Sequence, residues 1–234
     1  MNLRDYKYKT ELHAHTTPCS ACSQIPPEEE VRIYSELGYT SIVISNHFNE
    51  IMRFYGDKEK AVKTYLIDYN TACRYGEKYG INVILGCEIR FTENMNDYLL
   101  FGIDTDFLTE AYDYIDKGIK EFSKFFRNDS RVLLQAHPFR NGMTEIDPSL
   151  LDGIETFNVH PGHNSRIALA AQYAKKHDFI VSAGTDYHHP THEGLSSLLT
   201  KEPIRDSYEL ANVLRSRDYL FEMSGNIILP YGVK

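Results

Sequence analysis

Histidine and carboxylate residues gather in four short clusters, each at the end of an apolar, strand-like run. The clusters are His13-Ala14-His15, Glu88, His137 and Asp186-Tyr187-His188. Imidazole and carboxylate groups brought together from separate strand ends form a pocket that binds divalent metal ions. A bound divalent ion activates water and polarises a substrate, so these residues predict metal-assisted hydrolysis.

The spacing within two of the clusters suits chelation. Residues two apart on a strand project to the same face, so His13 and His15 form one pair of ligands. Asp186 and His188 form a second pair with the same spacing. Any one of these side chains alone is more often an ordinary hydrogen-bonded or surface residue. Their joint occurrence at strand ends is what favours a metal site.

Strand-like and helix-like segments alternate along the whole chain. We expect strands at 8–13, 40–45, 82–88, 98–103, 131–137, 153–158 and 179–186, with a short terminal strand at 219–223. Helices are expected at 26–38, 57–79, 108–126, 163–177 and 205–215. Strands that are apolar on both faces and separated by helices indicate parallel α/β architecture. Polar residues at many carboxyl ends favour a closed barrel over a doubly wound sheet, because a doubly wound sheet gathers residues only at its switch point.

Composition sets the broad class. With 234 residues and 42% hydrophobic content, the chain has ample material for a sizeable core, and no linker divides it, so we expect one domain over 1–234. No run of apolar residues is long enough for a membrane span, and the first residues lack the apolar segment of a secretory signal. Four cysteines in a chain of this length favour reduced thiols and a cytoplasmic location.

The net charge of −8 limits which kinds of substrate or binding partner are compatible with the chain. A nucleic-acid polymer is disfavoured, because binding it depends on several basic side chains that contact phosphates. A small phosphorylated substrate is compatible with this charge, since bound dications reverse the local sign.

Five motifs, in order, resemble those of the polymerase-and-histidinol-phosphatase (PHP) superfamily over about residues 10–200. They are Glu11-Leu12-His13-Ala14-His15, Ser45-Asn46-His47, Gly86-Cys87-Glu88, Ala136-His137-Pro138 and Gly184-Thr185-Asp186-Tyr187-His188. The resemblance implies a distorted, TIM-like (β/α)7 barrel with two or three divalent ions (zinc, manganese or iron) and phosphoesterase chemistry. It places His13, His15, Glu88 and Asp186 on one metal. It makes Glu88 a bridge to a second metal that also takes His137, and it assigns His47 and His188 to a third.

The chain departs from the family pattern at three places. Asn46 stands where the family usually has aspartate. The expected fourth strand carries no histidine for the second metal and offers only Tyr98, so His160 or His163 is a candidate replacement. After the first histidine pair, the family commonly has a histidine or an aspartate as a ligand of the third metal, whereas the loop here reads Thr16-Thr17-Pro18-Cys19-Ser20-Ala21-Cys22.

Cys19 and Cys22 are separated by two residues, a spacing also found in redox motifs. A plain loop is favoured over Cys22 as a thiolate ligand, and both are favoured over a redox role. Arg140 and Arg166 are candidate substrate-binding residues, because a guanidinium can hold a phosphate through two hydrogen bonds. A solvated surface charge is an equal alternative for each.

The sequence therefore favours a metal-dependent phosphoesterase that acts on a small phosphomonoester or a nucleotide-like phosphate. In this hypothesis, His47 or His188 protonates the leaving alkoxide if it does not bind a third metal. Two alternatives stay open. One is another metallohydrolase reaction, such as amide or lactone cleavage, and the other is a non-catalytic metal-binding or regulatory domain. The sequence makes no prediction about the oligomeric state.

Overall fold

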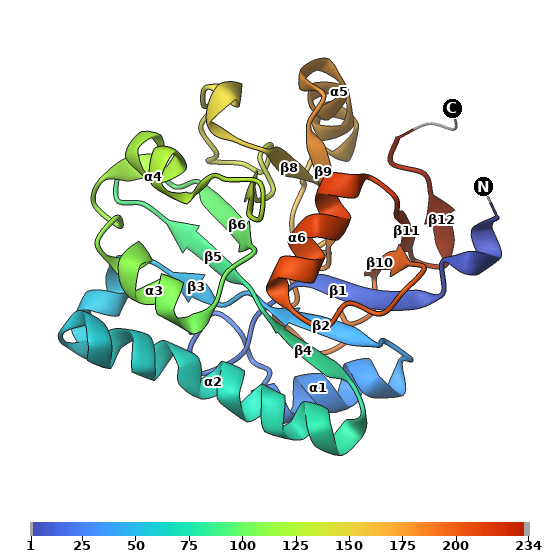
Figure 1. Ribbon diagram of the computed structural model, residues 1–234, viewed down its shortest axis with the longest axis horizontal. Coiled ribbons are helices and arrows are strands. Elements are labelled where there is room, and N and C mark those ends of the chain that lie inside the picture. Colours follow the sequence, from blue (N-terminus) through green and yellow to red (C-terminus); the bar gives the residue numbers. More distant parts are fainter. Residues whose placement is uncertain (1, 232–234) are drawn as a thin grey trace.

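Two mixed β-sheets form the centre of the molecule, and helices pack around them (Figure 1). The computed structural model describes residues 2–231. The first sheet has the strand order β12-β11-β10-β1-β2-β4, and the second has the order β3-β5-β6-β7-β8-β9. The strands are β1 (Tyr8–Ala14), β2 (Ser41–Ile44), β3 (His47–Phe48), β4 (Asn82–Leu85), β5 (Cys87–Arg90), β6 (Asp97–Phe101), β7 (Val132–Gln135), β8 (Gly153–Asn158), β9 (Ile180–Gly184), β10 (Ser196–Thr200), β11 (Leu220–Met223) and β12 (Asn226–Ile228).

Most neighbouring strands that carry the predicted clusters are parallel, as the sequence indicated. The pairs β1–β2, β2–β4, β3–β5, β7–β8 and β8–β9 are all parallel. Strand β6 runs antiparallel to both β5 and β7, and β10 runs antiparallel to β1. The short link of residues 91–96 explains the direction of β6, because a parallel connection needs a dozen or more residues.

The α/β class is confirmed, but a closed seven-stranded barrel is not. The hydrogen-bonded strands form two separate sheets, and the first sheet ends in the antiparallel strands β10, β11 and β12. The carboxyl end of β1 meets the segment after β9 through a single β-bridge between Ala14 and Tyr187. Two further hydrogen bonds, Tyr187 N to His13 O and His15 N to Tyr187 O, support this contact. This contact brings the first and last clusters of the sequence together.

The helices are α1 (Pro27–Glu36), α2 (Lys58–Tyr79), α3 (Thr105–Tyr112), α4 (Gly118–Phe126), α5 (Ile167–His177) and α6 (Ser207–Ser216), with short 3₁₀ segments at Leu3–Asp5, Glu50–Tyr55 and Pro148–Leu150. The long helix α2 packs against α1 and β4 along the lower edge of Figure 1. Asp57 caps its first turn, and Gly80 ends it in the left-handed conformation. No described helix is long and apolar enough to cross a membrane.

The single helix predicted for 108–126 is wrong, since the structure has two helices there. Gly118 begins α4 with a φ of +76°, a conformation that favours glycine. A Cβ at this position would lie 2.2 Å from Glu93 Oε2. The same carboxylate accepts a hydrogen bond of 2.8 Å from Ile119 N, so it caps the start of α4.

Helix α6 contacts β6, β7 and β9 at the end of the sheets opposite the histidines. The segment just before it is held there by Ser41 and Asn82, at the starts of β2 and β4, which donate hydrogen bonds to Ile204 O. Apolar residues of α6, including Leu210 and Leu214, belong to the main core. The other end of the parallel strands is left for polar side chains.

Candidate metal centre

Four candidate ligand residues from three strand ends surround one point near the carboxyl end of β1. His13 Nε2 lies 3.4 Å from Glu88 Oε1 and 3.5 Å from Asp186 Oδ1. His15 Nε2 lies 3.4 Å from Glu88 Oε2 and 3.4 Å from Asp186 Oδ1. All four residues are at most 2% exposed. The structure thus brings together the four residues predicted for the first metal.

The spacing of these atoms fits a metal ion. Ligands at about 2.0–2.1 Å from one tetrahedral zinc ion lie about 3.4 Å from one another. The Nε2 atoms of His13 and His15 are buried and have no hydrogen-bond partner. Buried polar atoms without partners are rare in folded proteins, and a bound ion would satisfy both of these. The residues present therefore fit the metal that the sequence predicted.

A second group shares Glu88 with the first. His137 Nε2 lies 3.1 Å from Glu88 Oε1, and His47 Nδ1 lies 2.7 Å from Glu88 Oε2. Asp97, at the start of β6, completes this group, with Oδ2 3.9 Å from His137 Nε2. Its carboxylate also accepts two hydrogen bonds of 2.7 Å from Arg90. Asp97 was not among the predicted site residues.

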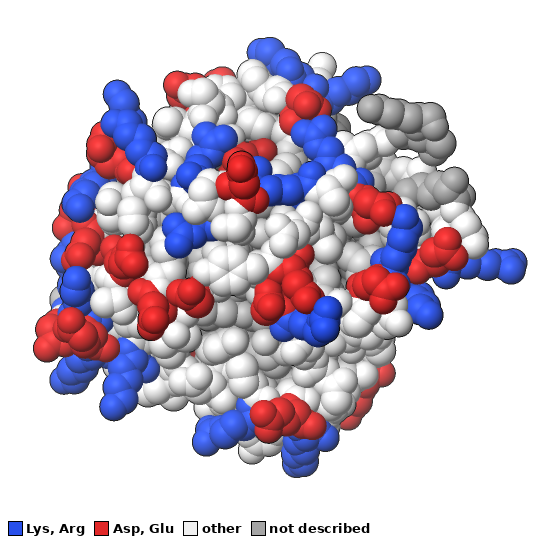
Figure 2. Space-filling model, in the orientation of Figure 1, with Lys and Arg blue, Asp and Glu red and all other residues white. Residues whose placement is uncertain are grey.

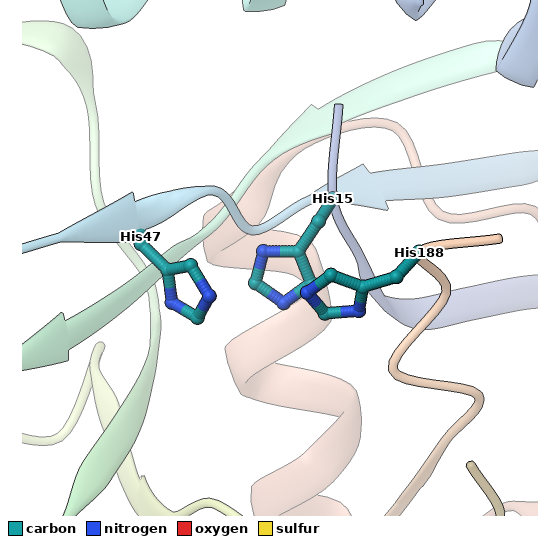
Figure 3. Close-up of side chains that lie close together, drawn as sticks. All are labelled: His15, His47 and His188. Atoms are coloured by element: carbon teal, nitrogen blue, oxygen red, sulfur yellow. The ribbon is translucent and has the colours of Figure 1, made fainter. Parts of the chain in front are cut away.

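The third group consists of His15, His47 and His188, and Figure 3 shows the His15 ring between the other two. The ring centroid of His15 lies 4.4 Å from that of His47 and 4.2 Å from that of His188. Cys22 is a free thiol at the surface beside this group. Partial burial alone would raise the pKa of its thiol, but hydrogen bonds with His188 and His47 lower the pKa to about 6.

Opposite charges dominate the electrostatics of the centre. Burial alone would lower the pKa of His13, but Glu155, Asp186 and Glu88 together raise it well above its ordinary value. The positive neighbours of Glu88, above all His13 and His47, hold the pKa of that carboxyl well below its usual range despite burial. Burial, assisted by His188 and His47, lowers the pKa of His15. The Glu88 carboxylate is therefore ionised and can bind a cation.

Asn46 has a structural role in this fold. Its Oδ1 accepts hydrogen bonds from Thr16 N (2.7 Å) and from Ser20 Oγ (2.8 Å), and its Nδ2 donates to Thr16 Oγ1. Ser20 Oγ lies 3.2 Å from His15 Nδ1. The amide that replaces the family's aspartate thus anchors the loop after β1, and through Ser20 it orients His15.

His160 and His163 do not join His137. Their rings stack on each other at 4.3 Å, and His160 lies 5.9 Å from the ring of His188. Among the described residues, neither belongs to a group of three ligands within 4.8 Å of one another. The second group instead contains Asp97, beside His137 and Glu88.

The two predicted arginines lie in different environments. Arg140 reaches the centre, with guanidinium nitrogens 3.6 Å from Asp97 Oδ2 and 3.6 Å from Asp186 Oδ2. Arg166 is exposed and donates hydrogen bonds to Phe139 O and Asn141 Oδ1. Both line a cavity of about 400 Å³ beside the centre, together with Phe139 and Tyr173. Of these two arginines, only Arg140 contacts residues of the metal centre.

A second buried carboxylate was missed by the sequence reasoning. Glu155, in β8, is 1% exposed and lies 2.7 Å from His13 Nδ1. Its signal in the sequence was a glutamate in the interior of an apolar strand, Gly153-Ile154-Glu155, whereas Glu88 was predicted because it ends an apolar run.

The sequence matches the PHP domain family over residues 11–227, and the chain belongs to this family. A comparison with curated proteins found no match. Solved structures show the same fold at low identity. A two-domain protein from Bacteroides vulgatus containing a predicted PHP-like metal-dependent phosphoesterase is 17% identical, with a TM-score of 0.64, and the alignment covers 94% of this chain and 66% of that one.

Two other similar structures differ in the activity that their names give. A proposed metal-dependent phosphoesterase from Bifidobacterium adolescentis is 15% identical, with a TM-score of 0.56 and coverage of 88% of this chain and 95% of that one. An amidohydrolase from Chromobacterium violaceum, with bound sulfate and no metal, is 13% identical, with a TM-score of 0.52 and coverage of 79% and 89%. Identities this low support the fold and leave the reaction to be argued from the site.

Proposed function

We propose that this protein is a metal-dependent phosphoesterase that hydrolyses a small phosphomonoester or a nucleotide-like phosphate. The observation that carries the proposal is the shared carboxylate of Glu88. It lies 3.4 Å from the ring nitrogens of His13 and His15 on one side and 3.1 Å from that of His137 on the other. A carboxylate in this position suits two neighbouring divalent ions. When bound, such ions would polarise the phosphoryl oxygens and lower the pKa of a water molecule.

Arg140 favours a phosphoester over an amide or a lactone. Its guanidinium lies between Asp97 and Asp186, at the edge of the metal centre. A fixed guanidinium recognises the oxygens of a phosphate through paired hydrogen bonds, whereas a neutral amide or lactone has no such charge to bind.

His47 and His188 are the candidates for protonating the leaving group. Burial alone would lower the pKa of His47, but Glu88 and Cys22 raise it to about 10, so the ring holds a proton at neutral pH in the absence of metal. Its side chain is 23% exposed and that of His188 is 11% exposed, so both reach the open side of the centre. If a third ion binds these two histidines together with His15 or Cys22, a different group must supply the proton.

A small substrate suits the surface better than a polymer does. Figure 2 shows acidic and basic side chains interspersed over one face of the molecule, without a continuous basic track. The net charge of −8 adds to this argument, since binding a polyanion depends on several basic contacts.

The test is a substrate panel assayed with added Mn²⁺, Zn²⁺ or Fe²⁺. It covers sugar phosphates, nucleotides, histidinol phosphate, short oligonucleotides, and an amide and a lactone. We expect release of phosphate from one of the small phosphoesters. Cleavage of oligonucleotides alone would reject the proposed substrate class, and cleavage of the amide or lactone alone would favour another metallohydrolase. No turnover with any metal would favour a non-catalytic metal-binding domain.

A further inference from the structure

Glu155 lies under the metal centre and uses both of its carboxylate oxygens. Oε1 lies 2.7 Å from His13 Nδ1. Oε2 accepts hydrogen bonds from His137 N (2.9 Å) and from Asn158 Nδ2 (3.0 Å). Among the described residues, no lysine or arginine is a hydrogen-bond or ion-pair partner of Glu155. The carboxylate therefore connects strand β8 to one predicted ligand of the first metal and one of the second.

We infer that Glu155 is a positioning residue for the metal centre. It holds His13 in the tautomer that presents Nε2 to the first metal, and it holds the backbone turn that presents His137 to the second. The inference rests on the proposed metal site, but it does not depend on which substrate that site hydrolyses.

The chemistry of the two rings explains the first role. A neutral imidazole carries a hydrogen on only one nitrogen, and an ionised carboxylate only accepts hydrogen bonds. Glu155 therefore favours hydrogen on Nδ1 of His13. The lone pair on Nε2 then faces Glu88 and Asp186 at 3.4 and 3.5 Å, and this Nε2 has no hydrogen-bond partner of its own. A carboxylate bound to the far nitrogen of a ligating histidine is a general device for orienting the ring and increasing its basicity.

The backbone of His137 explains the second role. His137 has a φ of 30°, close to the left-handed region that non-glycine residues rarely adopt. Its N–H is the donor to Glu155 Oε2, so the carboxylate stabilises this turn directly. The opposite side of Glu155 is closed by β9. A Cβ on Gly184 would lie 2.5 Å from Glu155 Oε1 and 2.5 Å from His13 Cβ, so only glycine allows this close approach.

Glu155→Gln tests the inference because an amide cannot replace both oxygens. Two donors, His137 N and Asn158 Nδ2, face one oxygen, and His13 Nδ1 faces the other. Satisfying the two donors turns the amide NH₂ toward His13, which then needs a lone pair on Nδ1 and carries its hydrogen on Nε2. We expect the zinc affinity of this variant, measured by chelator competition, to fall about 10–100-fold. Nitrogen NMR of labelled histidine should show His13 in the Nε2–H form in the metal-free variant at high pH.

Glu11→Gln is the matched control. Glu11 is equally buried, on β1, and its oxygens accept hydrogen bonds from backbone amides and from the hydroxyls of Thr185 and Tyr34, but from no imidazole. We expect this variant to lose stability, while zinc affinity and the His13 tautomer stay close to those of the wild type. This pattern would separate the loss of a buried carboxylate from the loss of the His13 contact.

The wild-type protein provides a test that needs no variant. An Nε2–H tautomer of neutral His13 in the wild type would overturn the inference, as would wild-type zinc affinity in Glu155→Gln. These outcomes are independent of the proposed function. A chain that binds zinc through an oriented His13 but hydrolyses no phosphoester would contradict the function and leave the role of Glu155 intact.

Discussion

The first and second groups of the metal centre, here called its first and second halves, share Glu88. They differ in which positive groups already neutralise their other carboxylates, Asp186 and Asp97. In the first half, Asp186 faces His13 and His15, whose Nε2 atoms have no hydrogen-bond partner. In the second half, Asp97 is held by two hydrogen bonds of 2.7 Å from Arg90. An ion entering the first half meets carboxylates and two ring nitrogens that have no hydrogen-bond partner. An ion entering the second half must share the carboxylate of Asp97 with the guanidinium of Arg90.

This difference predicts unequal affinities. A buried carboxylate that is already paired with a cation gains less from a metal ion than one whose charge is not fully compensated. We therefore expect the first equivalent of metal to bind more tightly than the second. Isothermal titration of the metal-free protein with Zn²⁺ or Mn²⁺ should show two steps, and two equal sites would contradict the comparison.

Glu88→Gln should have the largest effect, because it removes the one carboxylate that both halves share. We expect loss of tight binding at both sites and a fall in phosphoesterase activity greater than the roughly 10–100-fold that outer-shell changes cost. The fold should persist, since glutamine keeps the shape of the side chain. Metal content and turnover are the measurements. Glu59→Gln, an exposed carboxylate on α2, is the control. Full metal content with unchanged turnover would reject Glu88 as the shared ligand.

Asp97→Asn should separate the two halves. The substitution removes a ligand from the second half only. We therefore expect the affinity for the second equivalent of metal to fall by at least the roughly 10-fold that outer-shell changes cost, while the affinity for the first equivalent is unchanged. Stoichiometry measured by chelator titration tests this directly. Loss of the first equivalent, or no change in the second, would show that the halves are not arranged as the structure suggests.

The metal affinity of the first half should depend on pH through His13. The surrounding carboxylates raise the pKa of this ring well above its ordinary value, whereas the pKa of His15 is lowered. Metal must therefore displace a proton from His13 but not from His15. Apparent affinity should fall as pH decreases below the raised pKa, by about tenfold per pH unit for the one proton displaced. A flat affinity from pH 8 to 6 would contradict this.

The raised pKa of His13 has the opposite effect on the stability of the metal-free protein, which should decrease as pH rises. A raised pKa means that protonated His13 stabilises the folded state, so this contribution is fully present below about pH 6.5 and is lost as pH rises through the folded pKa. Metal-free and metal-loaded samples should therefore respond to rising pH in opposite directions in a thermal unfolding series, as far as this group is concerned.

The comparison also shows which ligands can be read from sequence. Residues such as His13, Glu88 and Asp186 follow apolar runs, and parallel strands bring their carboxyl ends to one edge, so their meeting could be predicted. Asp97 was missed because it begins a strand. In the antiparallel strand β6, the amino end lies at the edge where the parallel strands end. The short link of residues 91–96 was the available signal for this reversal.

Other features depend on contacts between distant segments. Glu155 lies inside β8 and not at its end, and its role follows from the positions of His13 and His137, far away in sequence. The alternation of strands and helices predicted the α/β class. The division into two sheets was not predictable from that alternation, because it depends on how β10 returns antiparallel beside β1.

The smallest effects on activity should come from substitutions of Arg140 and Arg166, and the two substitutions should differ in their effect on KM. Arg140 lies 3.6 Å from carboxylates of both halves, so a phosphate bound at the metals would meet its guanidinium. Hydrogen bonds to charged groups contribute about 1.5–3 kcal/mol, so Arg140→Ala should raise KM about 10–100-fold. Arg166 already donates to Phe139 O and Asn141 Oδ1 and is exposed. Arg166→Ala should therefore change KM by less than about fivefold, the equivalent of 1 kcal/mol. Metal stoichiometry should be unchanged in both variants. A larger effect for Arg166 than for Arg140 would indicate that the phosphate binds in the cavity beside the metal centre and not at the edge that the two halves share.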